Sequence, residues 1–396
     1  MIAWRARPWI CAWALVAGVA ASSCARQAPA PLWPGETWAQ SAPEEQGLDS
    51  AALSALDNEF ASGRHGYIDG MLIVRHGHVV FDRTYDHDYV KLFEGKDQTR
   101  GPYNYYDPDW HPWYRKSELH TLQSVSKSVT SAAIGVAIAR GEIPGVEVPI
   151  LNYFDANAIA SLDDRKRAIR LRDLLTMTAG FLWDEDTVPY TDPRNNCAAM
   201  EASRDWVRYV MDLPMDREPG KDFVYNSGAT ELEAHIILKA TGRQVDDYTD
   251  EHIFRPIGIR TYYWKHTPTG LPDTEGGLYL SRQDLARFGY LYLHDGVWYG
   301  KRVLPSSWIA ETLKPHPTSG ATQSSGVRYG YQWWLLPYGS WGARAPICWG
   351  YGGQFLFVVP EHDLVAVING WNIYDKPELD PVFALDRLLA TLRHGR

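Results

Sequence analysis

Short apolar runs separated by polar and glycine- or proline-containing turns occur near both ends of the chain, which is typical of strands. Residues 70–85 read as two such strands around His76-Gly77, and residues 354–369 as two more that turn at 360–363. A helix beginning at Asp49 and Ser50 precedes the first pair, and a helix over about 381–392 follows the second. The two ends of the chain therefore predict one antiparallel sheet with helices beside it.

Between these ends the pattern is helical. Apolar residues recur at helical spacing over 203–211, 229–241 and 281–295, and a short helix over 170–180 stops at a glycine. We expect an α+β fold with a single domain over 43–396. Residues 43–143 and 316–396 would form its α/β part, and residues 144–315 a mainly helical inserted part.

The N-terminus resembles an export signal. Arg5 and Arg7 precede an apolar stretch that is short for a membrane span, and small residues follow it. We assign residues 1–23 as a signal peptide and 24–42 as a tether. Cleavage before Cys24 would leave a lipid-anchored protein, although Ala21 stands where a lipoprotein signal usually has Leu. Cleavage after Ala25 is the alternative, and either predicts an exported protein, periplasmic or membrane-anchored, of a bacterium.

Composition narrows the function. The net charge is −9 and the basic runs are short, so nucleic acid is not an expected partner. The 17 Trp and 23 Tyr residues indicate an aromatic pocket or surface. Many of them fall in residues 86–116, which read either as a lid over a site or as a loop packed on itself.

Metal and disulfide chemistry have little support in the sequence. His76 and His78 flank a turn, but no third ligand has a matching spacing, so no metal site is expected. Cys197 and Cys348 are the cysteines beyond the signal region. They are either a disulfide pair or, as we prefer, two buried thiols.

Ser124 and Lys127 are the strongest candidates for chemistry. They lie three apart at the start of a segment that is apolar nearly all round, so both would share one face of a buried helix. A serine hydroxyl needs a base to become a nucleophile, and a lysine held neutral can be that base. The bland alternative is a helix-capping serine beside a solvated lysine. Burial favours a role, because an unpaired buried ammonium is costly.

Two further segments can complete such a site. Tyr225 lies in a small polar run before Gly228, and its phenol can relay protons if a cation such as Lys127 lowers its pKa. Residues 349–354 begin a predicted strand with little side chain, whose backbone can present an N–H to an oxyanion, with the N–H of Ser124 as second donor. A core tyrosine and a glycine-rich turn are the corresponding structural alternatives.

The order of these motifs resembles that of the serine β-lactamase-like hydrolases: Ser124-x-x-Lys127, then Tyr225-Asn226-Ser227, then Tyr351-Gly352-Gly353. That family comprises class C β-lactamases, DD-peptidases and related esterases. Residues 43–50, 171–178 and 329–334 look most similar to the branch of 6-aminohexanoate-dimer hydrolases and esterases. The resemblance implies a β-lactamase/transpeptidase-like fold and an acyl-enzyme on Ser124, with no cofactor or metal.

The chain departs from the family pattern in two places. The family has Asn two residues after the Tyr, where this chain has Ser227, so we expect Ser227 rather than Asn226 to reach the pocket. Tyr351 replaces a lysine that helps to hold a substrate carboxylate, although Arg344 is close enough in sequence to restore a cation. The remaining expected pocket residues are Gly352, Gly353, Gln354, Trp183, Trp333 and Trp334.

These observations predict a serine hydrolase that cleaves short-chain carboxylic esters or linear amides. A 6-aminohexanoate-oligomer hydrolase, or an amidase of D-amino-acid amide or DD-peptidase type, is the alternative enzyme. A non-catalytic envelope protein that binds peptidoglycan peptides is the alternative without chemistry. An α/β-hydrolase is excluded, because the chain has no Gly-x-Ser-x-Gly. The sequence does not predict an oligomeric state.

Overall fold

The computed structural model describes residues 31–101, 104–316, 326–339, 343–373 and 379–393. Residues Leu32–Arg396 group as one compact unit. The predicted signal peptide and Cys24 lie outside the described residues, so both stay predictions. Within the described part of the chain, no helix combines the length and apolar character of a membrane span.

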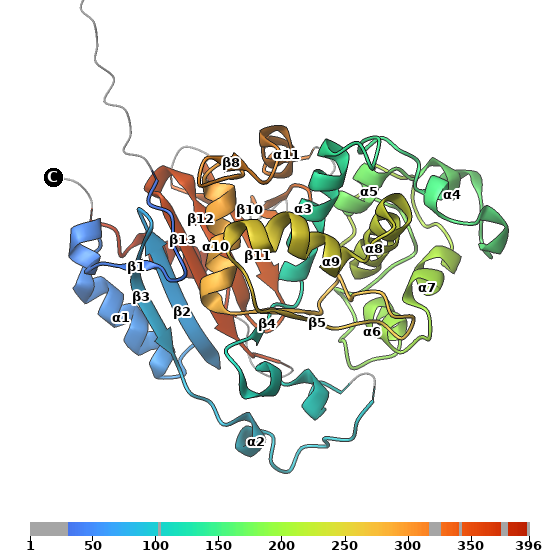
Figure 1. Cartoon of the computed structure of the whole chain (residues 1–396). Helices are drawn as coiled ribbons and strands as arrows, with labels where there is room; N and C mark the ends of the chain where they lie inside the picture. The colour runs from blue at the N-terminus through green and yellow to red at the C-terminus, as the bar shows by residue number, and fades with distance from the viewer. Residues whose placement is uncertain (1–30, 102–103, 317–325, 340–342, 374–378, 394–396) are drawn as a thin grey trace, which may run out of the picture. The chain divides into compact units, whose positions relative to one another are not determined.

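One eight-stranded sheet organises the described part of the chain, in the order β1-β3-β2-β13-β12-β11-β10-β9 (Figure 1). The first four strands in space come from the N-terminal region and the last hairpin, so the two ends of the chain meet at the centre of the sheet. The strands are β1 Ala39–Gln40, β2 Ile68–Arg75, β3 His78–Thr84, β9 Arg328–Tyr329, β10 Trp334–Tyr338, β11 Ala343–Gly350, β12 Gln354–Val359 and β13 Leu364–Gly370.

The pairing confirms the predicted α+β fold with one change. All neighbouring strands are antiparallel except β1 and β3, which run parallel at one edge, so the sheet is mixed. The central pair β2 and β13 joins Leu72 to Val367 and Val74 to Val365. Nearly every side chain of β2 is buried, because both faces of the sheet are covered.

Helices cover the two faces of the sheet. On one face, α1 (Ser50–Ala61) and α12 (Pro381–Leu389) pack through Leu53, Phe60 and Leu385. On the other face lie α10 (Arg282–Leu293) and α3 (Val125–Ala139) (Figure 1). Gly289 lets α10 approach closely, because a Cβ there would lie 2.7 Å from Cδ1 of Leu356.

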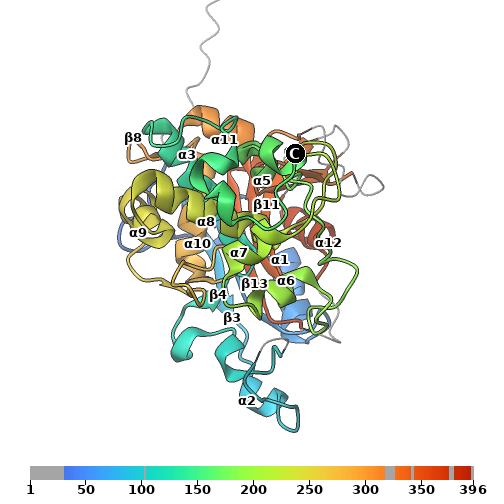
Figure 2. The same ribbon diagram turned by 90° about the vertical axis from the view of Figure 1, so that its right-hand side faces the viewer.

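The inserted region is mainly helical, as predicted, and lies on the side of the sheet opposite α1 (Figures 1 and 2). It includes α10, which packs on the sheet and so extends the α/β part. Its other α-helices are α4 Asp164–Ala168, α5 Leu171–Leu175, α6 Asn196–Glu201, α7 Trp206–Asp212, α8 Ser227–Thr241, α9 Val245–Thr249 and α11 Ser306–Thr312. The short helix α2 Tyr89–Leu92 precedes the inserted region. The small sheets comprise β4 His120–Thr121, β6 Leu278–Leu280 and β5 Tyr263–Trp264, and the pair β7 Val297–Trp298 and β8 Lys301–Arg302.

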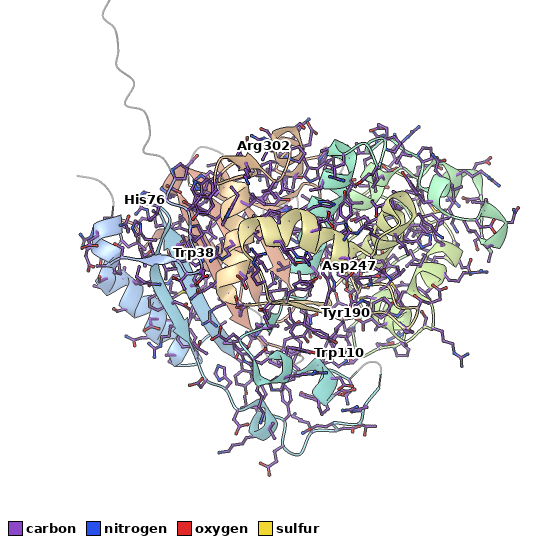
Figure 3. The ribbon with its side chains drawn as sticks, in the orientation of Figure 1. Trp38, His76, Trp110, Tyr190, Asp247 and Arg302 are labelled. Atoms are coloured by element: carbon purple, nitrogen blue, oxygen red, sulfur yellow. The ribbon has the colours of Figure 1, made fainter. Side chains whose placement is uncertain are left out.

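Residues 32–42, expected to be part of a tether, instead pack on the fold. Trp38 is buried between the sheet edge and α10, and its indole N–H donates to the carbonyl of Gln283 (Figure 3). The Arg287 guanidinium donates to the carbonyls of Gly35 and Glu36. The side chains of Trp33 and Trp38 both pack against Tyr290 of α10 and so hold this stretch on the fold.

Candidate active site

Ser124 lies at the point where the chain enters α3. Gln123, the residue before it, has φ +48°, and its side chain is held by a 3.0 Å hydrogen bond to the Thr121 hydroxyl. This strained backbone is typical of functional sites. Ser124 is only partly buried, whereas the helix that follows is buried through Ala137, so the turn leaves the serine hydroxyl accessible.

Lys127 lies one helical turn further on, and its ammonium is bound on two sides. Its Nζ donates to Oγ of Ser124 at 2.8 Å and to the carbonyl of Glu275 at 2.7 Å, and lies 3.5 Å from Oε2 of Glu275. Burial alone would lower the pKa of Lys127, but the carboxylates of Glu275 and Glu185 outweigh it, and the pKa is raised. At rest Lys127 is therefore an ammonium, not the neutral base expected from the sequence.

Tyr225 approaches the same atoms from a loop before α8. Its hydroxyl hydrogen-bonds with Ser124, and Nζ of Lys127 lies 5.4 Å from its ring centroid. Burial raises the pKa of the phenol well above its usual value, and Glu185 raises it further against the opposing effect of Ser124. The expected lowering by Lys127 is not seen. Tyr225 is a neutral phenol, which can donate a proton to a leaving group.

A cavity of about 490 Å³ opens beside Ser124. Aromatic rings form most of its wall, three carboxyl side chains join them, and none of its described lining residues is Lys, Arg or His. The lining residues are Ser124, Glu185, Asp186, Tyr190, Phe223, Tyr225, Val327, Trp334, Trp349, Tyr351, Asp380, Pro381 and Val382. The cavity thus combines an aromatic wall with acidic side chains.

Glu185 is the site residue that sequence reasoning missed. Its buried carboxylate accepts hydrogen bonds from the Trp183 indole at 2.6 Å, the Tyr190 hydroxyl at 3.2 Å and both N and Oγ of Ser227 at 2.8 and 2.9 Å. Burial raises its pKa to about 7, while Lys127 acts in the opposite direction. The donors of these four hydrogen bonds lie 2 to 42 residues away in sequence, so no local sequence pattern predicts the role of Glu185.

Asn226 and Ser227 do not reach the cavity. Asn226 is buried and caps α8, because its side-chain oxygen accepts from the N–H of Ala229 at 2.9 Å. Ser227 is already helical, so the strand-like alternation that favoured it does not apply. It acts on the site only through Glu185, and the expectation that Ser227 lines the pocket is wrong.

The glycine-rich segment forms a turn, which corrects the expected strand start. Residue 350 ends β11 and Gln354 begins β12, with Gly352 and Gly353 at φ +82° and +97° between them. Tyr351 lines the cavity at the end of β11. The Gln354 side chain is buried and bonds the carbonyl of Gly370, so it faces away from substrate.

Of the three tryptophans predicted to line the pocket, one does so and two lie in the core. Trp334 lines the cavity and stacks on Tyr225 with centroids 5.7 Å apart. Trp333, the residue just before β10, is fully buried and packs on Tyr292 at 4.4 Å, so its expected pocket role is wrong. Trp183 is also in the core and contributes only through its bond to Glu185.

Arg344 does not restore a cation to the cavity. Its guanidinium donates to the carbonyl of Gly326, and it sits near the start of β11, seven residues before Tyr351. Seven residues of strand span roughly 23 Å. The place taken by a lysine in the family therefore carries no charge among the described residues.

The remaining predictions concern thiols, metals and the aromatic loop. Cys197 and Cys348 are both free and buried. Cys197, Glu201 and Glu275 place one potential ligand atom each within 4.8 Å of one another, yet the Lys127 ammonium beside Glu275 disfavours a further cation there. The aromatic loop packs behind the cavity, with Tyr105 5.5 Å from Tyr351.

Several known proteins of similar sequence or fold are hydrolases. The beta-lactamase family model matches residues 56–377. The 6-aminohexanoate-dimer hydrolase of Paenarthrobacter ureafaciens is 25% identical over 279 residues, 65% of this chain and 68% of its own length.

Solved structures show the same fold. A Bacillus anthracis protein assigned as a 6-aminohexanoate-dimer hydrolase aligns with TM-score 0.65 and 20% identity, over 91% of this chain and 86% of its own. A family VIII carboxylesterase aligns with TM-score 0.62 and 15% identity, over 87% and 96%. With the Ser-x-x-Lys helix at the cavity, the match over residues 56–377 establishes that the chain belongs to the beta-lactamase family of serine hydrolases.

Proposed function

We propose that this protein hydrolyses short-chain carboxylic esters, and linear amides more slowly, through an acyl-enzyme on Ser124. The observation that carries the proposal is the contact of Ser124 Oγ with both Lys127 Nζ, at 2.8 Å, and the Tyr225 hydroxyl, beside a cavity of about 490 Å³. One group can take the serine proton and the other can supply a proton to the leaving group, as acyl transfer requires.

The reaction starts when Lys127 gives a proton to its carboxylate partner. Ser124 Oγ then attacks the carbonyl carbon while its proton passes to neutral Lys127. Backbone N–H groups of Ser124, at the start of α3, and of Tyr351 are our proposed donors to the oxyanion. Tyr225 protonates the leaving oxygen or nitrogen. Water then attacks the acyl group, and its protons restore Tyr225 and Ser124.

The charge of the cavity sets the substrate class. Glu185, Asp186 and Asp380 line it without a described cationic side chain. Two like charges 6 Å apart at an effective dielectric constant of 20 repel by about 3 kcal/mol. That corresponds to about two powers of ten in rate. β-Lactams and peptides with a terminal carboxylate are therefore disfavoured, while neutral acyl groups fit and a quaternary ammonium gains from the aromatic wall.

Three 4-nitrophenyl hexanoate esters test this class. They differ only at the far end of the acyl chain, which carries a methyl, a trimethylammonium or a carboxylate group. At pH 8 we expect kcat/KM to rank trimethylammonium first, methyl second and carboxylate last, about a hundredfold below methyl. Nitrocefin should be slower than the methyl ester. A kcat/KM for the carboxylate ester or for nitrocefin above that of the methyl ester would overturn the proposed substrate class. Activity that survives in Ser124→Ala would overturn the proposed mechanism.

Export is also a proposal. The charged start, the apolar stretch and the small residues before Cys24 support it. The intact mass of the mature protein, made in a bacterium with its full leader, decides between the two cleavages. A diacylglyceryl mass on Cys24 indicates a lipoprotein, and an unmodified chain starting at Arg26 indicates ordinary secretion. An uncleaved chain in the cytoplasm would contradict export.

A further inference from the structure

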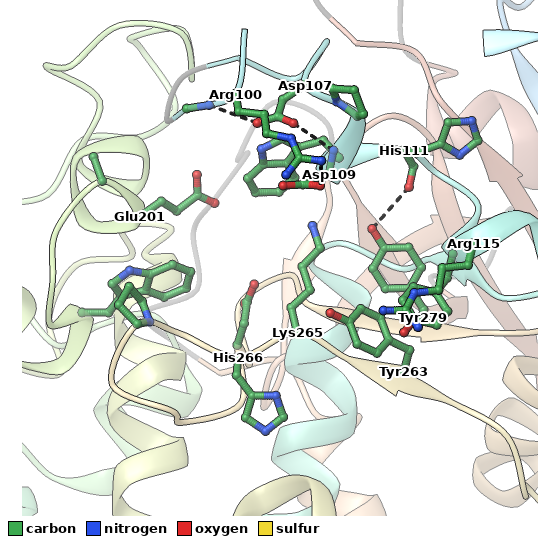
Figure 4. Close-up of a pocket in the computed structure, with 18 of the residues that line it drawn as sticks. Arg100, Asp107, Asp109, His111, Arg115, Glu201, Tyr263, Lys265, His266 and Tyr279 are labelled. Carbon is green, nitrogen blue, oxygen red and sulfur yellow. Dashed lines mark hydrogen bonds and ion pairs between the residues drawn. The ribbon is translucent and has the colours of Figure 1, made fainter. Parts of the chain in front are cut away.

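A second cavity, of about 910 Å³, shares no lining residue with the substrate cavity. Its wall combines the loop around Asp109, the end of α6 and residues between β5 and β6. Figure 4 shows the Glu201 carboxyl and the Lys265 ammonium projecting into it. Neither Ser124 nor Tyr225 lines this cavity, so the mechanism above does not use it.

Glu201 joins this cavity to Glu275. Each carboxyl group has an oxygen within 4.8 Å of the other and of Sγ of Cys197. Two ionised carboxylates this close repel each other and have only acceptor oxygens, so the pair is favoured when it shares one proton. Glu201 is the partner that lines the second cavity.

Glu275 in turn contacts Lys127, with 3.5 Å between Oε2 and Nζ. A continuous series of polar groups therefore runs from the second cavity to the catalytic ammonium. We propose that Glu201 and Glu275 form a proton-sharing pair that passes the proton of Lys127 to water in the second cavity. Glu201 is then a positioning residue for proton transfer that does not touch substrate.

The step balances without another reagent. The Lys127 ammonium gives a proton to Glu275, while Glu201 releases the shared proton to a water molecule in the cavity. The pair keeps one proton and one negative charge, and Lys127 becomes the neutral amine that can accept the Ser124 proton. The proton released to the cavity is the one that ester hydrolysis to a carboxylate produces overall. An acyl group that fills the substrate cavity would leave this route open.

The proposed mechanism needs such a route, because Lys127 must lose a proton before it can act as a base. At rest the pKa of Lys127 is raised, by carboxylates that outweigh its burial, and the Tyr225 phenol is neutral, so neither group can accept a proton from Ser124. Burial, and then Glu275, raise the pKa of Glu201 well above its usual value, which is consistent with a proton held in the pair. The charged and titratable groups that act on Lys127 or Glu201 from the surrounding elements are Tyr105, Glu185, Cys197, Lys265, Asp273, Glu275 and Tyr329.

Glu201→Gln tests the relay with little change of shape. Its amide can still donate to Glu275 but cannot pass a proton. We expect kcat for 4-nitrophenyl acetate to fall about a hundredfold, the lower end of what a positioned proton-transfer group contributes, with KM nearly unchanged and a larger solvent deuterium isotope effect. Asp109→Asn makes the same acid-to-amide change in the same cavity, at an exposed residue paired with Arg100, and should behave as the wild type.

Rescue separates a relay from a merely structural role. Glu201→Ala opens space beside Glu275, and formate should restore its kcat in a saturable way, whereas chloride at the same ionic strength should not. A Glu201→Gln variant with wild-type kcat, pH profile and isotope effect would overturn the relay, as would a slow Glu201→Ala variant that formate does not rescue. The inference rests on the proposed function. If the wild type has no Ser124-dependent activity, the proposed function is wrong. If that activity is present but substitution of Glu201 does not change it, only the relay is wrong.

Discussion

The buried carboxyl of Glu185 makes the stability of this protein depend on pH in a defined direction. Burial raises its pKa to about 7 from an ordinary value of 4.5. The folded state therefore binds this proton more tightly than the unfolded state does. The resulting stabilisation is fully present below about pH 4.5 and is lost as the pH rises through 7. A gap of about 2.5 pKa units corresponds to ~3 kcal/mol.

Glu185→Gln removes this titration and leaves the other buried carboxyl groups in place. We expect the free energy of unfolding of the wild type, minus that of Glu185→Gln, to fall by ~3 kcal/mol between pH 4.5 and pH 8.5. Urea unfolding of both proteins at several pH values across that range measures it. Asp109→Asn, at an exposed carboxyl, should run parallel to the wild type. Parallel curves for Glu185→Gln and the wild type would refute the reasoning.

Three further changes test the site and its surroundings. Tyr225→Phe keeps the ring that stacks on Trp334 but lacks the hydroxyl, so kcat should fall by about two to four powers of ten while the thermal midpoint stays nearly unchanged. Turnover at the wild-type rate would contradict the proton-donor role. Lys127→Ala should lose at least as much activity, and a pH–rate profile with unchanged limbs would exclude Lys127 from proton transfer. Gly228→Ala would place a Cβ against Val210 and 2.9 Å from the Trp183 ring, so the free energy of unfolding should drop by about 1–3 kcal/mol in urea, and no change would show that α8 can shift.

The parts of the fold that the sequence predicted are those with a strong apolar pattern. The hairpins β2–β3 and β12–β13 have apolar runs that stop at glycine or proline turns, and α3 has an uninterrupted stretch of small and apolar residues over 132–139. The 32–42 stretch was misread because it has no periodicity at all. Trp33 and Trp38 fix it by packing on α10 and its neighbours, which is a tertiary effect.

The sequence predicted site residues correctly where a known chemical role and the helical spacing agreed. It failed where the choice lay between two adjacent residues. Ser124 and Lys127 share a helix face, so their contact follows from spacing. Trp333 and Trp334 are adjacent where β10 begins, one in the core and one at the cavity, and the sequence cannot say which of them faces the cavity. Asn226 was a readable helix cap, and recognising it would have moved Ser227 out of the pocket.

Residues that act through distant partners were beyond the sequence. Glu185 depends on donors from its own loop and on Ser227, 42 residues later, and Glu201 gains its significance only from Glu275, 74 residues later. The raised pKa of Lys127 likewise comes from carboxylates that sequence spacing does not place. A lone Ser-x-x-Lys therefore predicts the nucleophile but not the charge state of its base.

Trapping of the acyl-enzyme tests the central claim most directly. The protein is incubated with a 4-nitrophenyl alkylphosphonate, which forms a stable adduct with an activated serine, and the modified peptide is sequenced by mass spectrometry. The account predicts one adduct, on Ser124, with loss of esterase activity in proportion to labelling and no adduct in Ser124→Ala. An adduct on Ser126 or another residue, or full esterase activity in Ser124→Ala, would contradict it.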